Sequence, residues 1–121
     1  MIVMVFEYRV EDDFYDEYLK EAMDLRPHLK EIEGFVSIER FESKTEPGKF
    51  VSIGYFEDEE AVTAWRNTPQ HRRVQALGRK RLLKDYRLCM ADVSRDYSMT
   101  RRGDAPQDSK MVHGGEEMTD V

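Results

Sequence analysis

The spacing of hydrophobic residues changes repeatedly along this chain of 121 residues, and the order of the spacings limits its possible folds. Residues 2–10 are β-branched or aromatic with apolar residues at every second position, which is typical of a strand. Residues 13–31 repeat their apolar positions every three or four residues, as an amphipathic helix does. The complete pattern predicts strands over residues 2–10, 35–41, 50–56 and 85–97, and helices over residues 13–31 and from Asp58 to about Leu83.

Proline and glycine positions refine these boundaries. Pro27 falls inside the first helical pattern and should kink or break it, because proline has no backbone donor and clashes with the preceding turn. Gly34 should end that helix in a left-handed conformation. Pro47-Gly48 predicts a turn that joins two strands as a hairpin. Thr68-Pro69 should divide the second helical region, with Thr68 as the cap and Pro69 in the first turn.

This order predicts an α+β domain of the ferredoxin-like type, with a β-α-β-β-α-β order and a four-stranded antiparallel sheet. Both helices would cover one face of the sheet. The first and third strands are apolar on both faces, whereas a sheet with one face in water usually alternates more cleanly. We therefore expect a homodimer in which a second subunit covers the open face, giving a dimeric α+β barrel.

The chain divides into two parts by composition. Residues 1–97 carry the periodic patterns and form the predicted domain. Residues 98–121 are rich in Gly, Asp, Ser and charged residues and show no period. This segment is predicted to be a disordered polar tail.

Charge and composition argue against several partners. The net charge is −6, although residues 61–84 hold seven basic and no acidic side chains. A negative chain in which no aromatic residue lies between His71 and Leu83 does not favour nucleic-acid binding. No apolar run is long enough to span a membrane. The lone Cys89 excludes an intrachain disulfide, so a reducing cytoplasm is the expected location, and no metal-binding motif is present.

Three segments carry a resemblance to a known family: EGFVSIERFES, KFVSIGYFEDEEAVTAWRNTPQHRRVQALGR and a closing strand that ends in VSRDY. Over residues 1–97 they resemble the antibiotic biosynthesis monooxygenase (ABM) family of dimeric α+β barrels. The resemblance implies oxidation of aromatic polyketides by oxygen without metal or flavin, or, in another branch, haem binding and degradation. The haem-degrading branch uses a first-strand Asn, a Trp and a His; Trp65 and His71 match the last two, but Glu7 stands near the first.

Five residues are the predicted site: Trp65, His71, Tyr55, Tyr86 and Arg87. Trp65 lies on the apolar side of its helix, where it serves either the core or a cavity wall. His71 lies in a first helical turn, where the helix dipole favours a neutral ring that can accept a proton or bind a metal. Tyr55 and Tyr86, with Tyr8, are expected on the open face of the sheet. Arg87 would either stabilise a developing enolate or phenolate or form an ion pair at the dimer edge.

Three functions are compatible with these residues. The first is a cofactor-independent monooxygenase that acts on a small aromatic or polyketide-like substrate in the barrel. The second is a non-catalytic barrel that binds a small hydrophobic ligand or acts as a structural dimer. The third is a haem-binding or haem-degrading protein that uses His71. A fold of this kind does not by itself decide among them.

Overall fold

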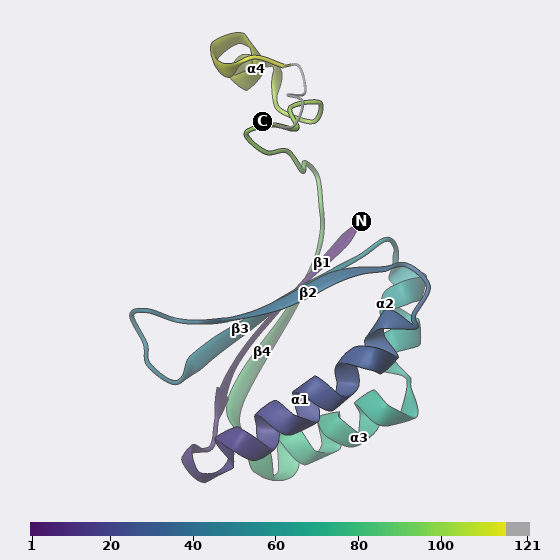
Figure 1. Ribbon diagram of the computed structural model, residues 1–121, viewed down its shortest axis with the longest axis vertical. Coiled ribbons are helices and arrows are strands. Elements are labelled where there is room, and N and C mark those ends of the chain that lie inside the picture. The colour runs from purple at the N-terminus through teal and green to yellow at the C-terminus, as the bar shows by residue number, and fades with distance from the viewer. Residues whose placement is uncertain (116–121) are drawn as a thin grey trace.

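The computed structural model describes residues 1–115, and its centre is one four-stranded antiparallel sheet (Figure 1). The strands are β1 (Ile2–Val10), β2 (Phe35–Glu42), β3 (Lys49–Phe56) and β4 (Leu83–Asp92). Their spatial order is β2-β3-β1-β4, so the first strand lies in the middle and the last one at an edge. The predicted α+β, ferredoxin-like fold is confirmed.

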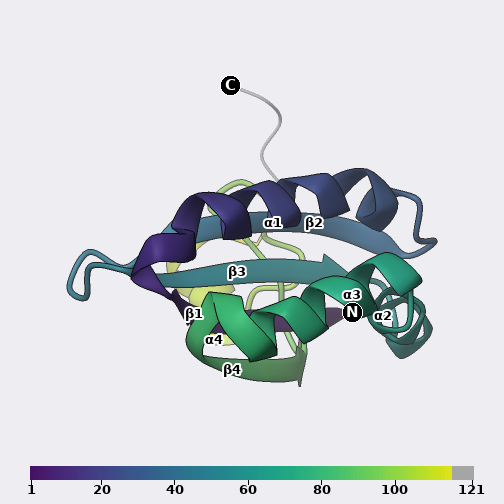
Figure 2. The ribbon, with the colours of Figure 1, turned by 90° about the horizontal axis from the view of Figure 1, so that it is seen from below.

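The helices lie together on one face of this sheet, as Figure 2 shows from the helical side. A short 3₁₀ turn, η1 (Asp12–Phe14), leads into α1 (Tyr15–Lys30). The second helical layer consists of α2 (Glu59–Arg66), α3 (Pro69–Leu77) and a single π-helical turn, η2 (Gly78–Leu82). One sheet face is therefore covered within the subunit.

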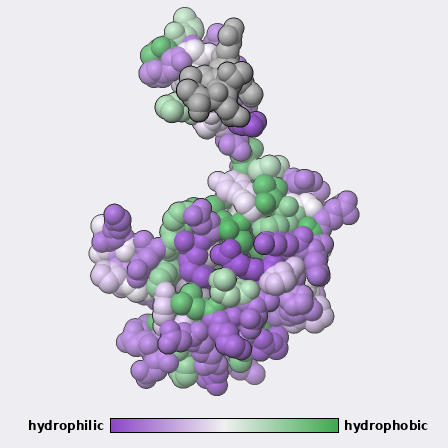
Figure 3. All heavy atoms as spheres, in the orientation of Figure 1, coloured by the Kyte–Doolittle hydropathy of each residue, from purple (hydrophilic) through white to green (hydrophobic). Residues whose placement is uncertain are grey.

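The core between helices and sheet has two parts. At one end Trp65 and its neighbours on α2 pack against Phe56 and Ile2. At the other end Tyr8 and Phe50 pack against Tyr18 of α1 and Leu82. Figure 3 shows that hydrophilic residues cover most of the helical part of the surface seen there, while hydrophobic ones gather nearer the sheet. The two core parts anchor the ends of the helical layer.

The expected effect of Pro27 is wrong, because α1 runs through it without interruption. Pro27 cannot donate to the carbonyl of Met23, one turn earlier. Met23 is 52% exposed, so water has access to this side of the helix and can replace the missing donor. A proline on the solvent side thus interrupts one hydrogen bond without ending the helix.

The predicted turn and cap signals are confirmed. Gly34 has a φ of 90° in the connection from α1 to β2, and Gly48 has a φ of 86° in the β2–β3 hairpin. The Asp58 carboxylate accepts a hydrogen bond from the Ala61 amide at 2.9 Å at the start of α2. Thr68 caps α3, and Pro69 is its first residue.

The C-terminal region differs from its prediction. β4 ends at Asp92 and not at Tyr97, and the chain then leaves the sheet as a stalk (Figure 1). Residues 107–113 form a short helix, α4 (Gln107–His113), and the Asp104 carboxylate accepts from the Asp96 amide at 2.5 Å. The prediction of disorder is therefore wrong for residues 98–115; residues 116–121 lie outside the described part.

Within the described residues, no helix combines the length and the apolar character that a membrane crossing requires.

Candidate functional site

Strand register divides the predicted site residues between the two faces of the sheet. Side chains of directly paired residues in an antiparallel sheet share a face. Tyr86 pairs with Tyr8, which is buried against the helices, whereas Tyr55 pairs with Val3 on the open face. The expectation of an open-face position is therefore confirmed for Tyr55 and wrong for Tyr8 and Tyr86.

Arg87 also lies on the open face, because it pairs with Glu7 on β1. Its guanidinium is 3.6 Å from the Glu7 carboxylate, and the side chain is 70% exposed. An exposed pair at this distance contributes little to stability. Arg87 and Tyr55 are thus separated by the sheet from the other three predicted residues.

Trp65, His71 and Tyr86 line one cavity between the helical layer and the sheet. The cavity has a volume of about 400 Å³. Its wall is mainly apolar, which suits a small organic molecule. The apolar lining comes from β1, α1, α3 and β4 and includes Met4, Phe6, Ala22, Leu25, Val74 and Leu88.

Trp65 belongs to both the core and the cavity wall. Its side chain is 5% exposed and packs with Ala61 and Val62 of the same helix. Its indole ring stacks on the His71 imidazole, with the ring centroids 4.3 Å apart and the planes 16° apart. Trp65 can therefore be both a core residue and part of the cavity wall, because its large ring packs in the core and also stacks on His71.

The turn between α2 and α3 fixes this stack. The Thr68 hydroxyl accepts from the His71 amide at 3.2 Å and lies 3.0 Å from the Trp65 carbonyl oxygen, to which it donates. Pro69 supplies a backbone angle that is already suited to a first helical turn. The short sequence from Trp65 to His71 thereby folds back so that its two rings meet.

A chain of polar contacts orients the imidazole. Arg72 donates to the Gln75 side-chain oxygen at 2.9 Å, which directs the Gln75 amide nitrogen toward His71 Nδ1 at 3.4 Å. This arrangement makes Nδ1 the acceptor and leaves the ring proton on Nε2.

Burial lowers the pKa of His71 to about 4. A hydrogen bond with the Trp65 backbone opposes this effect, and the charge of Arg72 adds to it. His71 is therefore a neutral imidazole at pH 7, as its position in the sequence predicted.

The residues around His71 do not fit an axial haem ligand well. Nδ1 already receives the Gln75 amide, and the ring also bonds to the Trp65 backbone. Ligation would require the ring to release one of these partners. The haem-degrading branch has an Asn on its first strand. The β1 residues near that place are Phe6 and Glu7, and Glu7 points to the opposite face of the sheet. We therefore derive no chemical step through haem.

Two basic residues of the cavity escaped the sequence analysis. Arg26 of α1 and Arg40 of β2 both line it, and both also line a larger groove of about 890 Å³ that runs along β2 and is open to solvent. Arg40 follows Val36 and Ile38 at alternate positions, so a charged side chain on an otherwise apolar strand face was the available signal. Arg26 stands next to Leu25 at the edge of the apolar stripe of α1.

The fold and cavity define a ferredoxin-like α+β protein with a partly open site between one face of its sheet and its helices. The family model of antibiotic biosynthesis monooxygenases matches residues 1–77. The chain belongs to this family, and the resemblance found in the sequence is confirmed.

Known relatives support the same assignment. A Pyricularia oryzae protein named jasmonate monooxygenase ABM is 36% identical over 94 residues, which are 78% of this chain and 44% of that protein. The chain thus spans less than half of that relative. A crystal structure of an antibiotic biosynthesis monooxygenase has a TM-score of 0.67 at 18% identity and covers 77% of this chain and 98% of its own.

A solved family structure from Deinococcus radiodurans has a TM-score of 0.72 at 9% identity, covering 81% of this chain and 97% of its own. Identities this low show the shared fold alone.

Proposed function

We propose that this chain is a monooxygenase that oxidises a small reduced aromatic or polyketide-like substrate without a cofactor. The observation that carries the proposal is the partly open, mainly apolar cavity with the Trp65–His71 stack in its wall. Membership of the monooxygenase family supports the reaction class. The name of the Pyricularia oryzae relative supports a small organic substrate, although this chain spans less than half of that protein.

The reaction needs a substrate that supplies its own electrons to oxygen. An activated CH₂ group loses a proton, and the resulting carbanion reduces O₂. One oxygen atom remains as a new C=O group and the other leaves as water, so CH₂ + O₂ gives C=O + H₂O. The protein has to position the substrate, exclude water and accept a proton.

The residues of the cavity have separate parts in this scheme. The neutral His71 accepts the substrate proton at Nδ1 after the Gln75 amide moves away. Trp65 holds the imidazole plane and contacts the aromatic substrate. Tyr86 presents a hydroxyl that already receives a hydrogen bond from Arg79 and can bind a phenolic oxygen.

A test uses dithranol, a tricyclic phenol with an oxidisable CH₂ group, in ¹⁸O₂ with chelator-treated protein. The proposal predicts uptake of one oxygen atom into the product at a rate that depends on the protein. His71→Gln should lower this rate at least tenfold, whereas His113→Gln, a matched change on α4, should not. Equal rates for these two variants would contradict the role of His71.

We also propose that the chain forms a homodimer through the open sheet face. Val3, Val5, Val51, Ile53 and Tyr55 are apolar or aromatic, half-buried and not covered by the helices. Such a face is more apolar than a sheet face in water usually is. A non-catalytic dimer that only binds a ligand shares this geometry and would bind dithranol without oxygen uptake.

A further inference from the structure

Within the described part of the domain, Arg26 and Arg40 combine partial burial with the lack of a carboxylate partner, whereas Arg66, Arg72, Arg79 and Arg95, which also lack one, are exposed. Arg9, Arg73, Arg81 and Arg87 each pair with a carboxylate. Arg26 and Arg40 have no such partner within residues 1–115, although both are partly buried. Partial burial of a cation is unfavourable unless an opposite charge compensates it.

Arg40 is held in place by a buried residue. Its Nε donates to the Tyr8 hydroxyl at 2.8 Å, and Tyr8 is 2% exposed and stacks on Phe50. Within residues 1–115, the two terminal nitrogens of Arg40 have no hydrogen-bond partner. These nitrogens form a planar fork that matches the two oxygens of a carboxylate.

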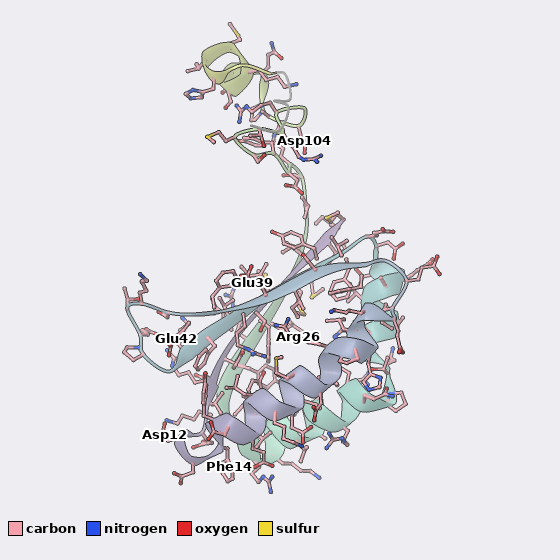
Figure 4. All side chains as sticks on the ribbon, viewed as in Figure 1. Asp12, Phe14, Arg26, Glu39, Glu42 and Asp104 are labelled. Carbon is pink, nitrogen blue, oxygen red and sulfur yellow. The ribbon has the colours of Figure 1, made fainter. Side chains whose placement is uncertain are left out.

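Arg26 approaches the same region from the opposite layer. Figure 4 shows it reaching from α1 toward the strands, and it lines the cavity and the open groove together with Arg40. The two arginines thus stand where the cavity meets solvent. Glu39, the acidic residue that also lines the cavity, pairs with Ile53 and so belongs to the other sheet face.

The other two arginines of the cavity, Arg72 and Arg79, are exposed and already bonded. Arg72 donates to Asn67 and Gln75, and Arg79 donates to Tyr86. The cavity arginines that keep free donors are therefore Arg26 and Arg40, while the Trp65–His71 stack lies in the apolar wall.

We propose that Arg26 and Arg40 bind the carboxylate of a small amphipathic organic acid whose apolar body fills the cavity. This inference rests on the proposed function and names its substrate class. The carboxylate would remain at the mouth, and the apolar body would extend toward Trp65 and His71. Oxygen would then attack the body of the acid, away from its charged end.

Trp65 provides a direct measurement, because it is the single tryptophan of the chain and lines the cavity. The probes are 4-phenylbutanoate and its neutral analogue 4-phenylbutanamide, titrated into the full chain without turnover. We expect the acid to change Trp65 fluorescence and to bind at least tenfold more tightly than the amide. Equal affinity of the two probes would overturn the proposal.

Variants locate the contact. Arg40→Gln and Arg26→Gln should each weaken acid binding about tenfold and leave amide binding unchanged. Arg66→Gln is the matched control, since Arg66 is exposed, lies beside Trp65 and does not line the cavity. Unchanged acid binding in both cavity variants, or an equal loss in Arg66→Gln, would overturn the proposal.

Tyr8 is a positioning residue in this scheme. Tyr8→Phe keeps the ring but removes the acceptor for Arg40, so acid affinity should fall several-fold while amide affinity stays. Thermal unfolding of each variant shows that it is folded. Arginine-dependent acid binding without any oxygen uptake from dithranol would contradict the proposed monooxygenase and leave only the acid-binding site, whereas oxygen uptake without arginine-dependent acid binding would overturn the acid site alone.

Discussion

His71 shows how the surroundings of a single residue decide its chemistry. The ring is stacked on Trp65, contacted by Gln75 and partly buried. Each feature keeps it neutral or fixes its orientation. The proton-accepting nitrogen of His71 therefore faces the side-chain amide of Gln75, which a substrate can displace, and not a charged partner.

The lowered pKa of His71 predicts a pH dependence of stability. The pKa is about 4 in the folded chain, against an ordinary value of 6.5, so the unfolded chain binds more protons between these values. Stability should therefore fall as pH decreases from 6.5 to 4, by up to about 3 kcal/mol from this residue. Urea unfolding of the native chain and of His71→Gln at several pH values measures the difference.

In His71→Gln this part of the pH dependence should be absent, while the contribution of the carboxylates stays. Titration of the His71 ring by NMR provides an independent measurement. A midpoint near 6.5 would contradict the buried, neutral ring.

Local sequence was enough to place Trp65 on the apolar side of α2 and His71 in the first turn of α3. Trp65 and His71 lie close together in the sequence, and Thr68-Pro69 determines the turn between them. Local sequence was not enough for Tyr86, because the face of a strand residue depends on register with a distant partner. β4 begins at Leu83 and is irregular opposite Arg9 and Val10, which local alternation does not reveal.

At the scale of elements, the connection from α1 to β2 is tightly constrained. Gly34 combines a φ of 90° with a position where an added Cβ would lie 2.9 Å from the Ala61 Cβ. The connection therefore has no room for a side chain, and α2 packs directly on it.

Gly34→Ala should be clearly more destabilising than Gly48→Ala. Both changes force alanine into a left-handed conformation, at about 1–2 kcal/mol. The overlap with Ala61 adds about 1–3 kcal/mol at Gly34 only, since nothing lies within 4 Å of a Cβ at Gly48. Urea unfolding measures both, and equal losses would show that the contact with α2 is looser than described.

The start of α3 gives a second prediction at this scale. Thr68→Ala removes the cap of the helix that carries His71 and should cost about 1 kcal/mol. The Trp65–His71 ring stack should loosen as well, so Trp65 fluorescence should change in the folded variant. Thr100→Ala in the tail is the control, and an effect of equal size there would argue against the cap.

Elements with a clear period were predictable, and short or irregular ones were not. The four strands, both caps and the hairpin turn followed from alternation and turn residues. α4 has seven residues and no apolar stripe, so its sequence resembled a disordered tail. The expected kink at Pro27 was wrong because the sequence does not show whether water can reach the Met23 carbonyl, which has no donor from Pro27.

At the scale of the whole molecule, the open sheet face predicts the assembly. Val5→Lys places a charge at the centre of this face and should convert a dimer into monomers. Met23→Lys on the exposed side of α1 is the matched control. Sedimentation velocity at micromolar concentration measures both, and a native chain that sediments as a monomer would contradict the dimer.

We infer that the reaction occurs between helices and sheet and not on the open face. Protein-dependent oxygen uptake with dithranol in two pairs of variants tests it most directly. We expect at least a tenfold lower rate in Trp65→Phe and His71→Gln, and rates within about twofold of native in Tyr55→Phe and Arg87→Gln. Loss of activity in the open-face pair with normal rates in the cavity pair would contradict it.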